Sequence, residues 1–229
     1  MVFIHHKQFS KRGINMKTKI KELPYLLFLL VMPVLGLIYK ILNNNPREAV
    51  ILSTNVDDKI PFLPVFILPY IIWYAFILGY LVYFWYKDTR VYLKTLTMIV
   101  IGELVCFVIY FFFQTTVPRP NLIGDGILID LVGMIYSHDQ PYNAFPSIHV
   151  LTTFAIILGN INIRNKHIIH SIFVPVMGTL IIISTLFVKQ HYILDMFASM
   201  FLTSFIYGIV FELHEINVTE KSKTVYVKD

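Results

Sequence analysis

Six long runs of apolar residues, separated by polar turns, constrain this chain more than any other feature of its sequence. The runs cover residues 23–42, 61–86, 95–113, 147–163, 171–188 and 191–211. A helix needs about 20 mostly apolar residues to cross the ~30 Å hydrocarbon core of a bilayer. The pattern therefore predicts an all-α integral membrane protein built as a six-transmembrane-helix bundle.

The composition agrees with a membrane protein and excludes ordinary soluble classes. Of the 229 residues, 56% are hydrophobic and 14% are charged, whereas soluble domains carry about 25% charged residues. The net charge of +5 does not indicate a nucleic-acid partner, because the basic residues gather at the ends of apolar runs. The one cysteine, Cys106, lies inside such a run, so no intrachain disulfide can form.

The basic residues also predict the orientation in the membrane. Fourteen of the 19 Lys and Arg residues lie in the N-terminal segment, in the C-terminal tail and in the turns at 87–94 and 164–170. Because cytoplasmic segments retain Lys and Arg, we expect both termini in the cytoplasm, with the plasma membrane of a bacterium as the location. The expected parts are a basic N-terminus (1–22), a six-helix membrane domain (23–211) and a polar tail (212–229).

Two features inside the membrane domain depart from simple spans. Residues 122–136 are apolar but interrupted by Asp125 and Asp130, so we expect a helix along the membrane interface, or a lid, in place of a span. Glu103 lies within the third run, where a carboxyl group has to be neutral or paired. A hydrogen-bonded structural role is expected for Glu103, and a functional role is the alternative.

Three polar clusters fall on the side of the membrane opposite the termini. They stand at the end of the third run, at the start of the fourth, and between the fifth and sixth. Their chemically distinctive residues are Arg119, Ser147, His149, Lys189, His191 and Asp195. Unrelated polar surface residues would not gather on one face. The clusters therefore predict a single site that faces the periplasm or the extracellular space.

The cationic and helix-capping residues of these clusters suit a bound phosphate. Arg119 offers a planar fork that matches phosphate oxygens, within a stiff Pro-Arg-Pro frame. Pro146-Ser147 is expected to open a helix whose first N–H groups favour an anion, with Ser147 as the N-cap or as a further donor. Lys189 adds positive charge, and the alternative is that it anchors a tight turn at the membrane surface.

The two histidines suit the transfer of a phosphoryl group. If the last helix begins near Gln190, His191 and Asp195 lie four residues apart on one face. The carboxylate could then accept the Nδ1–H and leave Nε2 as a base or nucleophile, while His149 protonates a leaving group. A zinc site made of His149, His191 and Asp195 is the alternative chemistry. Two nearby cations disfavour it, so no metal and no cofactor are expected.

These residues resemble the motifs of the type 2 phosphatidic acid phosphatase (PAP2) superfamily of membrane lipid phosphatases and phosphotransferases. The family motifs are Lys-x6-Arg-Pro, Pro-Ser-Gly-His and Ser-Arg-x5-His-x3-Asp. In the same order, this chain has Arg119-Pro120, Pro146-Ser147-Ile148-His149 and Ser184-x6-His191-x3-Asp195.

The resemblance implies a role for each motif residue. His191 would be the nucleophile that forms a phosphohistidine, and Asp195 would be its orienting carboxylate. His149 would be the general acid, with Arg119 and Ser147 holding the phosphoryl oxygens. The resemblance also implies a metal-independent enzyme with six membrane helices and a site that faces away from the cytoplasm.

The chain departs from the family motifs at three positions. Phe112 stands at the lysine of the first motif, Ile148 at the glycine of the second and Thr185 at the arginine of the third. Lys189 is expected to replace one of the lost charges. The segment Tyr-Asn-Ala-Phe-Pro-Ser-Ile-His looks closer to the branch that includes inositol phosphorylceramide synthases.

The sequence therefore predicts a membrane lipid phosphatase that hydrolyses a lipid phosphate monoester or diphosphate. The resemblance implies phosphatidic acid, phosphatidylglycerol phosphate or a polyprenyl diphosphate as candidate substrates. One alternative is a lipid head-group phosphotransferase, and the other is a non-enzymatic lipid-phosphate binder or transporter. The expected partners are the lipid substrate and the bilayer. The head group, the acyl preference and the oligomeric state stay open.

Overall fold

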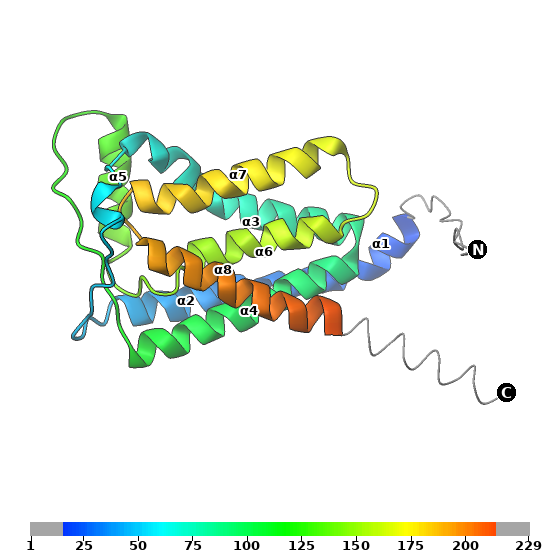
Figure 1. The fold of residues 1–229 in the computed structure, drawn as a ribbon. Helices are drawn as coiled ribbons and strands as arrows, with labels where there is room; N and C mark the ends of the chain where they lie inside the picture. Colours follow the sequence, from blue (N-terminus) through cyan, green and yellow to red (C-terminus); the bar gives the residue numbers. More distant parts are fainter. Residues whose placement is uncertain (1–15, 214–229) are drawn as a thin grey trace, which may run out of the picture.

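The computed structural model describes residues 16–213, which form a bundle of helices (Figure 1). In chain order its elements are α1 (Met16–Glu22), η1 (Leu23–Leu30), α2 (Val31–Asn43), η2 (Asp57–Lys59), η3 (Pro64–Phe66), α3 (Ile67–Lys87), α4 (Thr89–Phe112), α5 (Ile127–His138), α6 (Ile148–Asn162), α7 (Ile168–Phe187), α8 (Ile193–Tyr207) and η4 (Gly208–Leu213). Among these residues no β-strand forms, and the predicted all-α class is confirmed.

Five helical stretches within residues 16–213 are long and apolar enough to cross a membrane. They are Lys19–Asn43, Pro64–Lys87, Thr89–Phe112, Ile168–Phe187 and Ile193–Glu212. The predicted fourth span is α6, which has 15 residues and is therefore only about 22 Å long. The protein is thus an integral membrane helical bundle in which one of the six predicted spans is a shorter apolar helix.

Helix α6 occupies the middle of the bundle, where it packs against α3, α4, α7 and α8 (Figure 1). Glycines at the helix crossings permit this close packing. A Cβ atom on Gly159 of α6 would collide with Thr95 and Phe84, and one on Gly102 of α4 would collide with Leu151. Small residues at such crossings let membrane helices approach closely, because their association depends on packing contacts. The short helix is consequently surrounded by four helical stretches that are each long enough to cross a membrane.

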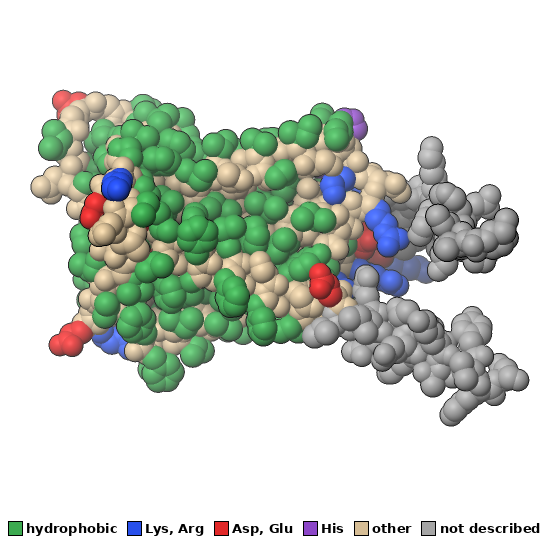
Figure 2. Space-filling model, viewed as in Figure 1, with side chains coloured by type: hydrophobic (Ala, Val, Ile, Leu, Met, Phe, Trp, Pro, Cys, Tyr) green, Lys and Arg blue, Asp and Glu red, His purple; other side chains and the backbone are tan. Residues whose placement is uncertain are grey.

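The outer wall of the bundle is hydrophobic, and the charged side chains gather toward its two ends (Figure 2). Large apolar side chains project outward all along it, among them Phe112, Phe201 and Phe205, which are 80%, 76% and 62% exposed. A continuous exposed apolar surface of this kind is typical of helices that face lipid.

The two ends of the bundle differ. Helices α1 and η4 lie at one end, whereas α5 lies crosswise over the other (Figure 1). The predicted interfacial helix thus exists as α5, shifted to Ile127–His138. The placement of the α1 end in the cytoplasm stays a prediction. Of the predicted N-terminus and tail, residues 1–15 and 214–229 lie outside the described residues.

Two loops at the α5 end are held against the end of α4. Val50 forms an isolated bridge with Thr115, and Thr116 forms one with Tyr142. The backbone N–H of Asn143 donates to the Thr115 carbonyl at 2.8 Å. These contacts fix the loop that precedes α6, and this loop carries part of the candidate site.

Candidate active site

His191 lies in the tight turn between α7 and α8. The backbone N–H groups of Gln190 and His191 both donate to the Thr185 carbonyl, at 3.0 and 3.1 Å. Lys189 adopts the left-handed conformation, with φ of 53°, and this reverses the chain at the end of α7. Helix α8 begins only at Ile193, so the turn, and not the helix, carries His191, although His191 and Asp195 still lie side by side.

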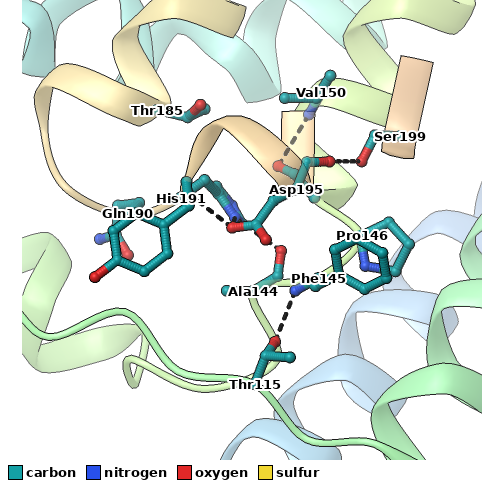
Figure 3. Close-up of polar contacts among 12 residues, drawn as sticks. Thr115, Ala144, Phe145, Pro146, Val150, Thr185, Gln190, His191, Asp195 and Ser199 are labelled. Carbon is teal, nitrogen blue, oxygen red and sulfur yellow. Dashed lines mark hydrogen bonds and ion pairs between the residues drawn. The ribbon is translucent and has the colours of Figure 1, made fainter. Parts of the chain in front are cut away.

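The Nδ1 atom of His191 has two possible acceptors (Figure 3). The Ala144 carbonyl oxygen lies 3.0 Å away, and Asp195 Oδ2 lies 3.5 Å away. Because a carbonyl oxygen only accepts, Nδ1 carries a proton, and in the neutral ring Nε2 then has the free lone pair. The sequence assigned this hydrogen bond to Asp195, but the nearer acceptor is a backbone carbonyl.

Asp195 is nevertheless beside the imidazole and is buried. Its Oδ2 accepts the backbone N–H of Tyr192 at 2.8 Å, which closes the first turn of α8. The carboxylate therefore holds the start of α8 next to His191. It also supplies a negative charge that would stabilise a positively charged imidazole ring.

The loop that carries Ala144 is itself tightly held. The backbone N–H of Phe145 donates to Thr115 Oγ1 at 2.8 Å (Figure 3). The Tyr110 hydroxyl, from the end of α4, donates to the carbonyl of Pro146. These contacts place the Ala144 carbonyl against His191 although the two residues are 47 positions apart.

Ser147 caps α6, as the sequence predicted. Its Oγ accepts the backbone N–H of Val150 at 3.3 Å, and α6 begins at Ile148. The backbone N–H of Ser147 donates to the Asp195 carbonyl at 3.4 Å. The start of α6 is thereby tied to the start of α8, so the second and third motifs meet.

His149, the second residue of α6, faces His191 with 5.9 Å between the ring centroids. Its ring stacks on Tyr70 at 4.7 Å and lies 4.1 Å from the ring of Trp73. Trp73 is fixed in turn by a hydrogen bond from Nε1 to Thr152 Oγ1 at 2.9 Å. Tyr70 and Trp73 are both buried inside the bundle and hold the His149 ring in place.

Both histidines line one cavity of about 560 Å³ between α2, α3 and α4, which we call the histidine cavity. This volume lies within the range of small-molecule sites, roughly 300–1,000 Å³. Tyr39, Asn43 and Asp139 line the cavity toward the α5 end. The cavity brings the predicted nucleophile and the predicted acid to one space that can hold a substrate.

Arg119 lies next to the turn that carries His191, but protein atoms occupy most of its donors. Nη1 donates to the Tyr136 carbonyl at 2.7 Å. Nη2 donates to the Asp139 carbonyl at 2.6 Å and to Gln190 Oε1 at 2.8 Å. The guanidinium also stacks 4.2 Å from the Tyr136 ring. Its buried Nε has no hydrogen-bond partner among the described residues.

Asp139 is a residue of this region that the sequence reasoning missed. Its Oδ1 accepts hydrogen bonds from Tyr39 at 2.8 Å and from Asn43 at 2.7 Å, so it joins α2 to the end of α5. Burial raises the pKa of Asp139, and the Tyr39 hydrogen bond and Arg119 act in the opposite direction. In the sequence Asp139 is an isolated loop residue, and nothing there indicates a partner on α2.

The Lys189 side chain binds backbone carbonyl groups, whereas the phosphate hypothesis requires it to bind phosphate oxygens. Its Nζ donates to the backbone carbonyls of Asp57 at 3.2 Å and Ile60 at 2.5 Å. Asp57, which is buried, also accepts the backbone N–H of Ile193 at 2.8 Å. These contacts are those of a turn anchor. The sequence reasoning missed Asp57, because the polar loop around it carries no periodic pattern.

Two of the positions that depart from the family motifs lie outside the histidine cavity. Phe112 projects from the end of α4 toward the outside and is 80% exposed. Thr185 is buried, and its hydroxyl donates to the Ile182 carbonyl at 2.7 Å. Among the described side chains, no three His, Cys, Asp or Glu residues are grouped so that they could hold a metal ion.

Comparison with known proteins adds one finding to this geometry. A family model for the PAP2 superfamily matches residues 52–209. The matched range includes Arg119, Ser147, His149, His191 and Asp195. No curated protein and no solved structure matched the chain. Because the family model covers more than half of its length, the chain belongs to the PAP2 superfamily.

Proposed function

We propose that this protein is a membrane lipid phosphatase that hydrolyses a lipid phosphate monoester or diphosphate through a phosphohistidine intermediate. Membership of the PAP2 superfamily supports phosphatase or phosphotransferase chemistry on lipid phosphates in general. The observation that carries the proposal is the hydrogen bond of the His191 ring and its place in the histidine cavity. Its Nδ1–H is bound to the Ala144 carbonyl, and its ring lines the histidine cavity with Nε2 as the nucleophilic atom.

In the first step, Nε2 of His191 attacks the phosphorus atom. A nitrogen–phosphorus bond forms while the bond from phosphorus to the lipid oxygen breaks. His149, whose ring centroid is 5.9 Å from that of His191, protonates the departing oxygen. Asp195 stabilises the positive charge that the imidazole ring gains.

In the second step, water replaces the nitrogen on phosphorus. His149, which gave up its proton in the first step, accepts one from the water. The nitrogen–phosphorus bond breaks, and inorganic phosphate leaves with His191 restored.

Arg119 and the Ser147 end of α6 are the groups that we assign to the phosphoryl oxygens. Arg119 retains its Nε–H as a buried donor without a partner among the described residues, and the first turn of α6 favours negative charge. We assign Lys189 to the turn, because its ammonium group already binds two backbone carbonyls. The site then relies on fewer cations than the family motifs contain.

A lipid head-group phosphotransferase is the second candidate. It differs only in the second step, where an alcohol in place of water attacks the phosphohistidine. The observation that favours it is the second-motif segment Tyr-Asn-Ala-Phe-Pro-Ser-Ile-His, which resembles the branch with inositol phosphorylceramide synthases.

Release of inorganic phosphate from a panel of lipid phosphates tests both candidates. The purified protein in detergent with EDTA should release phosphate from at least one phosphate monoester or diphosphate. Addition of an alcohol such as inositol should divert the phosphoryl group to a new ester only in a transferase. A protein that binds lipid phosphates but turns over none of them, with or without the alcohol, would be a binder or transporter.

A further inference from the structure

The histidine cavity continues from the catalytic residues into the membrane. Tyr70 and Leu78 of α3 both line it, and eight residues of helix separate them by about 12 Å. Met32 of α2 and Ile77 of α3 line the same deeper part. The deeper part is apolar and parallel to the helices, so it fits the hydrocarbon portion of a lipid whose phosphate lies at the histidines.

One polar group interrupts this apolar part. Glu103 of α4 lines the cavity and is only 5% exposed. It stands seven residues before Tyr110, whose hydroxyl reaches the start of α6, and this spacing is about 10 Å along the helix. The carboxyl group therefore lies roughly two helical turns deeper than the level of Tyr110.

The described residues give the side chain of Glu103 no hydrogen bond and no ion pair. The structural partner that the sequence led us to expect is thus missing from residues 16–213. A buried carboxyl group without a hydrogen bond is costly in an apolar environment, whether it is charged or neutral. The Glu103 carboxyl oxygens are not among the fully enclosed polar atoms that lack a partner, so they are open to the cavity, and a molecule that fills the cavity can supply the partner.

We propose that Glu103 accepts a hydrogen bond from a hydroxyl or amide N–H group in the backbone of the bound lipid. The protein would then select lipid phosphates that carry such a donor between the phosphate and the hydrocarbon chain. This inference rests on the proposed function, because it takes the lipid substrate as the occupant of the cavity. Glu103 is a specificity-determining residue in this proposal, remote from the phosphorus atom and without a role in the chemical steps.

A matched pair of substrates tests this selection. The pair is a monoacylglycerol phosphate with a free 2-hydroxyl and the same lipid with that hydroxyl methylated. An N-acylaminoalkyl phosphate and its N-methyl amide form a second pair for the amide N–H. We expect the wild-type protein to prefer the donor in at least one pair by about tenfold or more in kcat/KM, because an unpaired buried acceptor discriminates strongly against a ligand that lacks the donor.

Three variants separate recognition of the lipid by Glu103 from a general loss of activity. Glu103→Leu should lose the preference, with the donor-bearing lipid falling to the level of its methylated partner. Glu103→Gln should keep most of the preference, because its amide carbonyl still accepts. Leu78→Ala, in the same cavity, should lower both lipids of a pair alike. Hydrolysis of a small aryl phosphate, which does not reach Glu103, should be unchanged in the Glu103 variants.

Three results would overturn the inference and leave the proposed function standing. The first is a wild-type protein that hydrolyses both members of each pair equally. The second is a Glu103→Leu variant that keeps the wild-type preference, and the third is a Glu103→Leu variant that loses activity on both lipids and on the aryl phosphate to the same extent. If the wild-type protein releases phosphate from no lipid, the proposed function fails. Equal binding of both members of each pair would then overturn the inference as well.

Discussion

In the proposed mechanism, the reactivity of His191 depends on a backbone carbonyl. The Ala144 carbonyl binds Nδ1 of His191 at 3.0 Å and so leaves the lone pair on Nε2. No substitution of Ala144 removes that acceptor, because it belongs to the main chain. The variants that test the mechanism at the scale of the residue are therefore those of the histidines themselves.

His191→Ala should abolish turnover of lipid phosphates. Loss of a nucleophile removes roughly 10³-fold or more of the rate, and no acid-labile phosphoenzyme should be trapped from labelled substrate. His167→Ala is the control, because His167 caps the start of α7 and has no role in the proposed mechanism. Near-normal turnover in His191→Ala would exclude covalent catalysis by this residue.

His149→Ala should distinguish between substrates by their leaving groups. A general acid matters most when the leaving group is a poor one, such as an alkoxide. The variant should therefore lose far more activity on a lipid alkyl phosphate than on an activated aryl phosphate. We would measure kcat/KM for both compounds, and equal losses would point to a binding or structural role for His149.

At the scale of the element, the turn between α7 and α8 determines where His191 lies. Lys189 reaches from this turn to the carbonyls of Asp57 and Ile60, and Asp57 binds the backbone N–H of Ile193. The loop that contains η2 therefore braces the turn from outside the bundle. In the proposed mechanism, residues that do not contact the substrate can then affect catalysis through the position of His191.

Lys189→Ala and Arg119→Ala should consequently fail in different ways. Lys189→Ala removes two contacts of the turn, so we expect a lower Tm and a lower kcat, with KM close to that of the wild type. Arg119→Ala should raise KM for lipid phosphates or lower kcat by roughly 10²-fold, because it removes a cation from the site. If the Lys189→Ala variant had the wild-type Tm and a much higher KM, Lys189 would instead be assigned to phosphate binding.

For the whole molecule, the distribution of charge gives a testable orientation. We expect the α5 end, with the candidate site, to face away from the cytoplasm. Single cysteines at Asn44 or Asp58, which are exposed at the α5 end, should react with an impermeant thiol reagent on intact cells. Cysteines at Arg90 or Asn165, exposed at the α1 end, should not react.

The background for this labelling experiment should carry Cys106→Ala, although Cys106 is buried. Permeabilised cells provide the positive control, since all four positions should then react. Labelling of the Arg90 and Asn165 variants in intact cells would overturn the orientation.

The sequence by itself determined the helical class and the identity of the motif residues. Long apolar runs must form helices in a bilayer, because the hydrocarbon core offers no partner for backbone N–H and carbonyl groups. The crosswise helix α5 was also recognisable, since Asp125 and Asp130 interrupt an otherwise apolar run. Each of these features depends on residues that are neighbours in the chain, so it can be read from the sequence.

Only the tertiary structure decided how the candidate site is assembled. The acceptor for His191 is a main-chain carbonyl from another loop, and every residue type has such a carbonyl. The stacking of Tyr70 and Trp73 on His149 depends on the way α3 packs against α6. The missing partner of Glu103 became visible only when its neighbours were in place. Each of these features depends on contacts between residues distant in the chain, which packing creates and no local pattern encodes.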